Sequence, residues 1–226
     1  MADSEALAAP QYPAHHPALQ HHFDNMEQQR EASSLGMWVF LVTEIMFFGG
    51  MFTAYLVYRT TYYSAFRAAS EKMNMLFGGV NTAILICSSL TMALAVHAAQ
   101  LGRRRTVVLL LLFTILFGLG FTGIKVVEYH EHWVQHEFPG ARFHFSGPDP
   151  RHAEIFFWLY FVMTGFHELH LLIGIGAVGF IAWFAWKGEY SSEYHNPVEN
   201  VGLYWHFVDI VWIYLFPLLY LISHKH

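Results

Sequence analysis

Residues 106–127 read TVVLLLLFTILFGLGFTGIKVV, and Lys125 is the only charged side chain in this stretch. About 20 consecutive apolar residues are enough to cross the hydrocarbon core of a bilayer as an α-helix. A backbone in lipid must satisfy its hydrogen bonds within its own segment, so a helix is the expected structure. The stretch therefore predicts a transmembrane helix over Thr106–Val127.

Four further apolar stretches predict helices of the same kind, over Leu35–Tyr58, Leu76–Leu101, Glu154–Trp186 and Val201–Ser223. The stretch from Glu154 is longer than one crossing needs, so we expect it to tilt, to project beyond the membrane or to begin later. Only 13% of all residues are charged, whereas soluble domains carry about 25%. The predicted fold class is all-α, an integral membrane bundle of five transmembrane helices.

Residues 1–34 are polar and contain His15, His16, His21 and His22. No basic segment there is followed promptly by an apolar core, so a signal peptide is not predicted. We expect a solvated, His-containing cytoplasmic arm over 1–34 and a membrane domain over 35–226. The mild net charge of −5 implies no nucleic-acid partner.

The orientation in the membrane is predicted from Lys and Arg in the loops. The side with the N-terminus carries five of these residues and the other side carries seven if Lys125 is included. The three adjacent arginines of the short loop 102–105 are the sharper local signal. They predict a cytoplasmic N-terminus and a C-terminus outside.

Ionisable side chains inside a span are costly, and each one suggests a functional site. Glu44 lies in the first span beside Phe40, Phe47 and Phe48. Desolvation disfavours its charged form, so we expect it to be protonated or paired. A hydrogen bond between helices and a contact with protons or lipid headgroups remain the two alternatives.

The fourth span contains His167, Glu168 and His170 in the run HELH. His167 and His170 are three residues apart and share a helix face. A di-iron site would require Glu-x-x-His motifs on other helices, and a zinc site of the HExxH type has a different spacing. Hydrogen bonding between helices is favoured over metal ligation, and no metal site is predicted. Together with Glu44, His167 and His170 are the candidates for a lipid-related or proton-related role.

Two more pairs are spaced three residues apart: Lys125 with Glu128, and His206 with Asp209. Each pair can form a hydrogen bond along its own helix. We interpret all four residues as a structural polar network. A haem role for His206 is disfavoured, because an axial histidine needs a spacious apolar pocket.

Four motifs together resemble subunit III of the haem–copper respiratory oxidases, the cytochrome c oxidase subunit III family, in its five-helix form. They are Thr43–Phe48 (TEIMFF), Val127–Tyr129 (VEY), Thr164–Gly174 (TGFHELHLLIG) and Tyr204–Trp212 (YWHFVDIVW), in the family's order. The resemblance places Glu44 at the family's carbodiimide-reactive glutamate. It also matches His167, His170, His206 and Asp209 to motif positions, whereas Glu168 departs from the family's small residue.

The resemblance implies a subunit of an oxidase complex with no catalytic centre and no cofactor of its own. Haem and copper are expected in oxidase subunits I and II. Subunit III is expected to pack on subunit I, to bind phospholipid, and to support proton uptake, stability and sustained turnover. A bacterial-type inner membrane and a larger respiratory supercomplex fit the same interpretation.

Other functions stay open from the sequence. The alternatives are subunit III of a quinol oxidase and a related subunit that accompanies a nitric oxide reductase. A stand-alone transporter or channel would need a broken helix or a polar pathway, and Pro217 is the only proline inside a predicted span.

Overall fold

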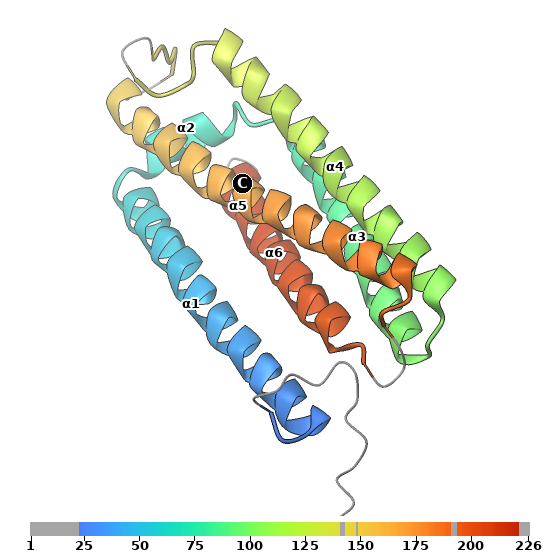
Figure 1. The fold of residues 1–226 in the computed structure, drawn as a ribbon. Helices are drawn as coiled ribbons and strands as arrows, with labels where there is room; N and C mark the ends of the chain where they lie inside the picture. Colours follow the sequence, from blue (N-terminus) through green and yellow to red (C-terminus); the bar gives the residue numbers. More distant parts are fainter. Residues whose placement is uncertain (1–22, 141–142, 148, 191–193, 222–226) are drawn as a thin grey trace, which may run out of the picture.

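The computed structural model describes residues 23–140, 143–147, 149–190 and 194–221, and these residues form helices and loops without a strand. The histidines of the N-terminal arm lie outside the described residues. Figure 1 shows the helices α1 (Met26–Thr61), α2 (Tyr63–Ser70), α3 (Met75–Gln100), α4 (Arg104–Val134), α5 (Pro150–Lys187) and α6 (Asn196–Tyr220).

Five of the helices in the described part are long and apolar enough to cross a membrane, namely α1, α3, α4, α5 and α6. This confirms the predicted all-α bundle. α2 has only 8 residues and was not predicted, because it is too short and too polar to stand out by hydropathy.

The long helices extend beyond the predicted spans. α1 begins at Met26, so it includes part of the segment that we assigned to the polar arm, and α4 continues to Val134. α5 has 38 residues and begins at Pro150, which rules out a later start, one of the three alternatives for this stretch. Hydropathy detects only the part of a helix that meets lipid, so helical turns at the membrane surface are missed.

Helices α3, α4, α5 and α6 form a closed bundle in which each helix packs against two neighbours. α1 packs against α5 and α6. α2, which follows α1 in the chain, packs against the first turns of α5 (Figure 1). Phe66 of α2 contacts Phe156 of α5 with ring centroids 5.5 Å apart. The added length of α5 is therefore used to bury α2.

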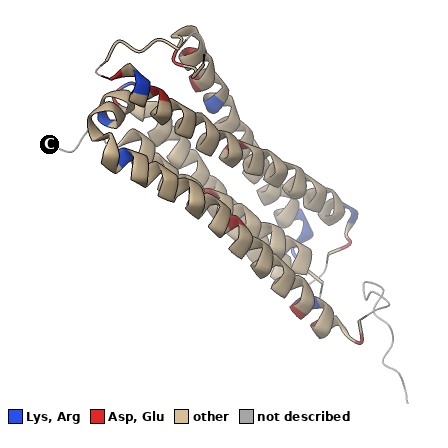
Figure 2. Cartoon of the chain, turned by 90° about the vertical axis from the view of Figure 1, so that its left-hand side faces the viewer, with Lys and Arg blue, Asp and Glu red and all other residues tan. Residues whose placement is uncertain are grey.

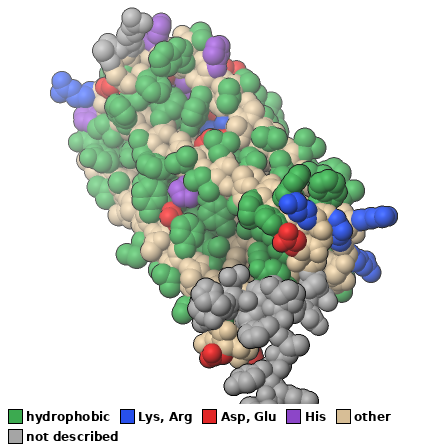
Figure 3. Space-filling view, in the orientation of Figure 1, with side chains coloured by type: hydrophobic (Ala, Val, Ile, Leu, Met, Phe, Trp, Pro, Cys, Tyr) green, Lys and Arg blue, Asp and Glu red, His purple; other side chains and the backbone are tan. Residues whose placement is uncertain are grey.

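The outside of the bundle is apolar. Met46 is 72% exposed and Leu76 is 70% exposed, which would be costly in water but matches a lipid environment. Figure 2 shows most Lys and Arg residues near the two ends of the bundle, and Figure 3 shows hydrophobic side chains over most of one face. Lipid is thus the solvent for the middle of the molecule.

Trp205 fills the centre of the closed bundle. A Cβ at Gly118 would lie 3.0 Å from its ring, and one at Gly174 would lie 3.2 Å from it. The indole Nε1 donates a hydrogen bond to Ser88 Oγ at 3.1 Å. By contrast, a Cβ at Gly120 or Gly176 would meet nothing within 4 Å, so only some of the glycines serve close packing.

Side chains from α1 and α2 hold the end of α6. Tyr55 donates a hydrogen bond to the carbonyl of Leu218, and Ser70 donates one to the carbonyl of Leu219 at 2.8 Å. The last carbonyls of a helix have no partner within it, so these bonds satisfy groups that lipid could not.

The opposite end of the bundle is held by Glu199, at the start of α6. It accepts a hydrogen bond from Gln100 of α3 at 2.9 Å and lies 3.3 Å from Arg30 of α1. Arg104 donates to the carbonyl of Ala185 at 3.0 Å and so caps the end of α5.

Candidate functional site

A buried ion pair lies near the α2 end of the bundle, between α4, α5 and α6. Lys125 Nζ is 2.9 Å from Glu128 Oε2, and the two residues are 2% and 1% exposed. The Lys125 ammonium also donates to Tyr160 at 3.2 Å and to Tyr220 at 3.1 Å. Tyr220 in turn donates to Glu128 Oε1 at 2.5 Å.

Aromatic rings surround this ammonium group. Lys125 Nζ lies 5.1 Å from the ring centroids of Tyr160 and Trp212 and 5.3 Å from that of Tyr129. Ring faces attract a cation, and they do so more strongly away from water. The predicted pairing of Lys125 with Glu128 is present, and it is the centre of a cage that spans three helices.

Glu44 pairs with His170. Glu44 Oε2 of α1 is 3.0 Å from His170 Nε2 of α5, and the two side chains are 19% and 14% exposed. The other ring nitrogen, Nδ1, lies 2.7 Å from the carbonyl oxygen of Phe166. The ring of Phe48 packs edge-on against the imidazole at 5.2 Å.

The positions of the two ring nitrogens fix how many protons this pair holds. A carbonyl oxygen can only accept a hydrogen bond, so Nδ1 of His170 must carry a proton. The contact between Nε2 and Glu44 then needs one more proton, which sits either on the carboxyl group or on the imidazole. In both forms the pair has no net charge, so an arginine is not required to neutralise Glu44.

His167 and His170 do not act together. His170 points to α1, whereas His167 is fully buried against Trp212, with ring centroids 5.2 Å apart. Neither nitrogen of His167 has a hydrogen-bond partner among the described residues. The carboxyl oxygens of Glu168 are also buried without a hydrogen bond in the described part of the chain.

The predicted hydrogen bond between His206 and Asp209 is absent, and this prediction was wrong. His206 Nδ1 lies 2.8 Å from Ser89 Oγ on α3 instead. Asp209 is 3% exposed, and its carboxyl oxygens form no hydrogen bond with a described residue. The three-residue spacing allows a hydrogen bond between His206 and Asp209, but the His206 imidazole bonds to the Ser89 hydroxyl on the neighbouring helix instead.

Several polar residues that take part in these contacts could not be predicted from the sequence. Tyr160, Tyr220 and Ser89 complete the groups above, and His132 Nδ1 lies 2.8 Å from Glu137 Oε2 in a further buried pair. Most of these partners are on other helices, so spacing within one helix gives no signal for them. Among the described residues, no three His, Cys, Asp or Glu side chains gather as metal ligands would.

Comparison with known proteins gives a consistent result. Residues 19–224 match the family described as cytochrome c oxidase subunit III. The chain is 31% identical over 201 residues to a cytochrome c oxidase subunit 3 of Thermostichus vulcanus, covering 88% of this chain and 92% of that protein. It is 34% identical over 188 residues to a cytochrome c oxidase subunit 3 of Synechocystis sp., and the match covers 83% of this chain and 74% of that protein. It is 30% identical over 202 residues to a cytochrome c oxidase subunit 3 of Cyprinus carpio, and the match covers 82% of this chain and 67% of that protein.

Proposed function

Because this chain belongs to the cytochrome c oxidase subunit III family, we propose that it is the non-catalytic subunit III of a proton-pumping aerobic cytochrome c oxidase. Haem and copper then reside in oxidase subunits I and II. This chain packs on subunit I, binds phospholipid, and supports proton uptake, stability and sustained turnover.

The observation that carries the proton-related part of this proposal is the contact between Glu44 and His170. The pair holds one transferable proton without a net charge, and it lies near the outer surface of the bundle. A group of this kind can remain in an apolar environment and still exchange a proton when water or a lipid headgroup reaches it. Lys125 and Glu128, in contrast, are fully enclosed and serve the structure.

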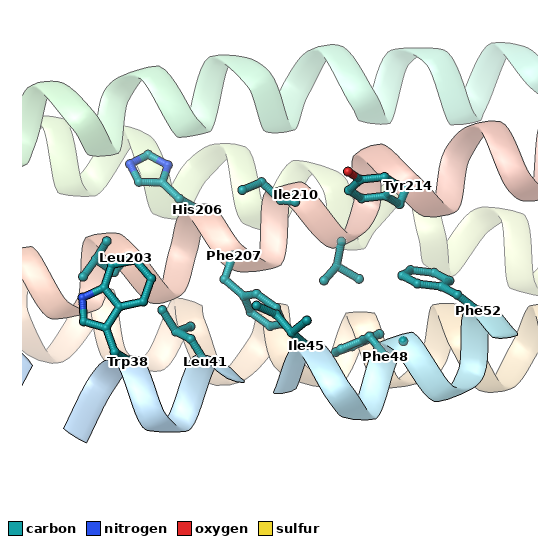
Figure 4. Close-up of a pocket in the computed structure, with 12 residues that line it drawn as sticks. Trp38, Leu41, Ile45, Phe48, Phe52, Leu203, His206, Phe207, Ile210 and Tyr214 are labelled. Carbon is teal, nitrogen blue, oxygen red and sulfur yellow. The ribbon is translucent and has the colours of Figure 1, made fainter. Parts of the chain in front are cut away.

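A groove between α1 and α6 supports the lipid-related part. It has a volume of about 470 Å³. Figure 4 shows its lining of apolar and aromatic side chains, including Trp38, Phe48 and Phe207, with His206 turned away from α1. An acyl chain needs such a surface, and the groove offers no charged group that would exclude one.

The proposed orientation places the N-terminus in the cytoplasm of a bacterial-type cell and the C-terminus outside. Arg30 lies near the start of α1, the arginines of 103–105 lie at the start of α4, and Lys187 ends α5. These three helix ends lie at the same end of the bundle (Figure 1). Lys125 is enclosed in the bundle and therefore does not count as a loop charge.

Purification in mild detergent, followed by mass spectrometry of the chains that co-purify, tests the proposal. We expect oxidase subunits I and II in stoichiometric amounts, with a haem spectrum that stays with them when this chain is removed. A chain that purifies without these subunits, or that carries haem or copper after it is separated, would contradict the proposal.

A further inference from the structure

A contact between two aromatic rings joins the end of α1 to the start of α5. Tyr62 is the single residue between α1 and α2, and its ring is stacked on that of His152 in the first turn of α5. The ring centroids are 3.7 Å apart, and the planes differ by 16°. Figure 1 shows the end of α1 and the start of α5 at the same end of the bundle, beside α2. His152 thus contacts the residue at which the chain passes from α1 to α2.

The stacking geometry indicates a charged imidazole. Two neutral rings prefer an offset or edge-on arrangement, because their electron-rich faces repel each other. Nearly parallel rings with centroids at 3.7 Å have little room for an offset. A cation above the same tyrosine face is attracted instead. The contact with Tyr62 is therefore favourable when both ring nitrogens of His152 are protonated, and it is weaker when only one is.

Asp149 supplies the counter-charge. Its Oδ2 lies 2.5 Å from His152 Nδ1, and such a short distance is expected of a charge-assisted hydrogen bond. An aspartate just before a helix usually accepts a hydrogen bond from a backbone N–H of the first turn. Asp149 makes no such bond, and its backbone has a φ of 53°, which residues other than glycine seldom adopt. The local structure thus favours the contact with His152 over ordinary helix capping.

Asp149 is the only described residue that forms an ion pair with His152, and the imidazole is 29% exposed, so solvent can exchange protons with it. Arg67 is paired with Glu71 instead, and Glu154 accepts a hydrogen bond from the backbone of Gly140. The charged or titratable residues of the segments around the contact are Tyr58 and Arg59 on α1, Tyr63, Arg67, Glu71 and Lys72 on and after α2, His136 and His144 before α5, and Arg151 and Glu154 on α5.

We propose that Tyr62, His152 and Asp149 form a proton-operated clasp, which holds the α1–α2 turn on α5 when the imidazole is charged and loosens when the imidazole loses a proton. The charged form gains its partners only in the closed clasp, so the clasp is complete in mildly acidic solution and is lost as the pH rises. In the orientation proposed above, this end faces the outside, where a proton-pumping oxidase releases protons. That use of the clasp rests on the proposed function, whereas the clasp itself does not.

A spin label beside the α1–α2 turn tests the proposal in the full chain. Ser64 is exposed and lies two residues after Tyr62, so we choose Ser64→Cys for the label, and Cys87→Ser removes the only native cysteine. Electron paramagnetic resonance should show a restrained label in mildly acidic buffer. The label should become more mobile as the pH passes through the range in which imidazoles lose a proton. His130→Phe removes an exposed histidine at the same end of the bundle and is the matched control, which should leave this response unchanged.

Two variants show whether the clasp causes the response. His152→Phe keeps a ring on Tyr62 but cannot take up a proton, so the label should lose its pH response. Asp149→Asn keeps the size of the side chain but removes the counter-charge, so the response should move to lower pH. A label whose mobility does not change with pH, or a response that survives His152→Phe, would overturn the proposal. If His152→Phe does not fold, Asp149→Asn decides, and a response at an unchanged pH would then overturn it.

The clasp and the proposed function can fail separately. If no oxidase subunit co-purifies with the chain, the proposed function fails, and the label can still respond to pH. If the subunits co-purify but the label does not respond, only the clasp is wrong.

Discussion

The positions of single residues in this bundle follow from the cost of charge in lipid. Glu44 contacts His170 at 3.0 Å, and Lys125 contacts Glu128 at 2.9 Å inside an aromatic cage, so each pair places a carboxyl group beside a basic group. The first pair is near the surface and the second is fully buried. The roles that we propose, proton exchange for the first pair and structural support for the second, follow this difference in burial.

Glu44 lies near the surface of the bundle, where a reagent dissolved in lipid can reach it, and its carboxyl group contacts His170 at 3.0 Å. We expect a hydrophobic carbodiimide, which reacts with a protonated carboxyl group, to label Glu44 in the assembled complex. Mass spectrometry of the labelled peptide provides the measurement, and Glu44→Gln is the control that should lose the adduct. An unlabelled Glu44 with a carboxylate infrared band that persists in acidic buffer would show an ionised group instead.

Replacement of Lys125 by Met should destabilise the chain strongly, because Glu128 would remain buried without its cation. The expected cost is about 3–5 kcal/mol in the free energy of unfolding. The double variant Lys125→Met with Glu128→Gln should recover much of this loss. Denaturation in detergent measures both, with the exposed Lys72→Met as the control. Equal losses in the single and double variants would show that the ion pair itself is not the cause.

At the scale of helices, close packing depends on a few small residues. Gly118 of α4 and Gly174 of α5 lie against Trp205, which brings these two helices up to α6. α1 has no comparable contact at Gly49 or Gly50, where an added Cβ would meet nothing within 4 Å. The closed bundle and the more loosely attached α1 therefore differ in how well they are packed.

The variant Gly118→Leu should disrupt the contact between α4 and Trp205, because the new side chain has no space. Overpacking of this kind costs about 1–3 kcal/mol. Gly120→Leu, on the same helix, is the matched control and should be tolerated. Thermal unfolding of the purified complex compares the two. Similar midpoints for both variants would contradict the packing role of Gly118.

Much of the helix arrangement could be predicted from the sequence, because hydropathy follows directly from contact with lipid. The five spans were found, whereas α2 and the surface turns of α1, α4 and α5 were not. Lys125 and Glu128 were correctly paired because they are neighbours on one helix. The partners of Glu44 and His206 were missed because His170 and Ser89 lie on other helices, and only the packing brings them together.

At the scale of the whole molecule, the groove between α1 and α6 is lined mainly by apolar and aromatic side chains, and it is the site that we propose for lipid. Among the described residues, the Lys125–Glu128 pair lies between α4, α5 and α6, whereas the Glu44–His170 pair lies between α1 and α5. This arrangement fits the proposed role of a subunit that supports a catalytic partner.

The most direct test of this account is turnover by the oxidase complex with and without this chain. We expect the complex that lacks it to keep its haem spectrum and its initial rate of oxygen reduction, but to lose activity during repeated turnover. Addition of the purified chain should restore sustained activity. Loss of the haem spectrum, or of the initial rate, on removal of the chain would contradict a non-catalytic role.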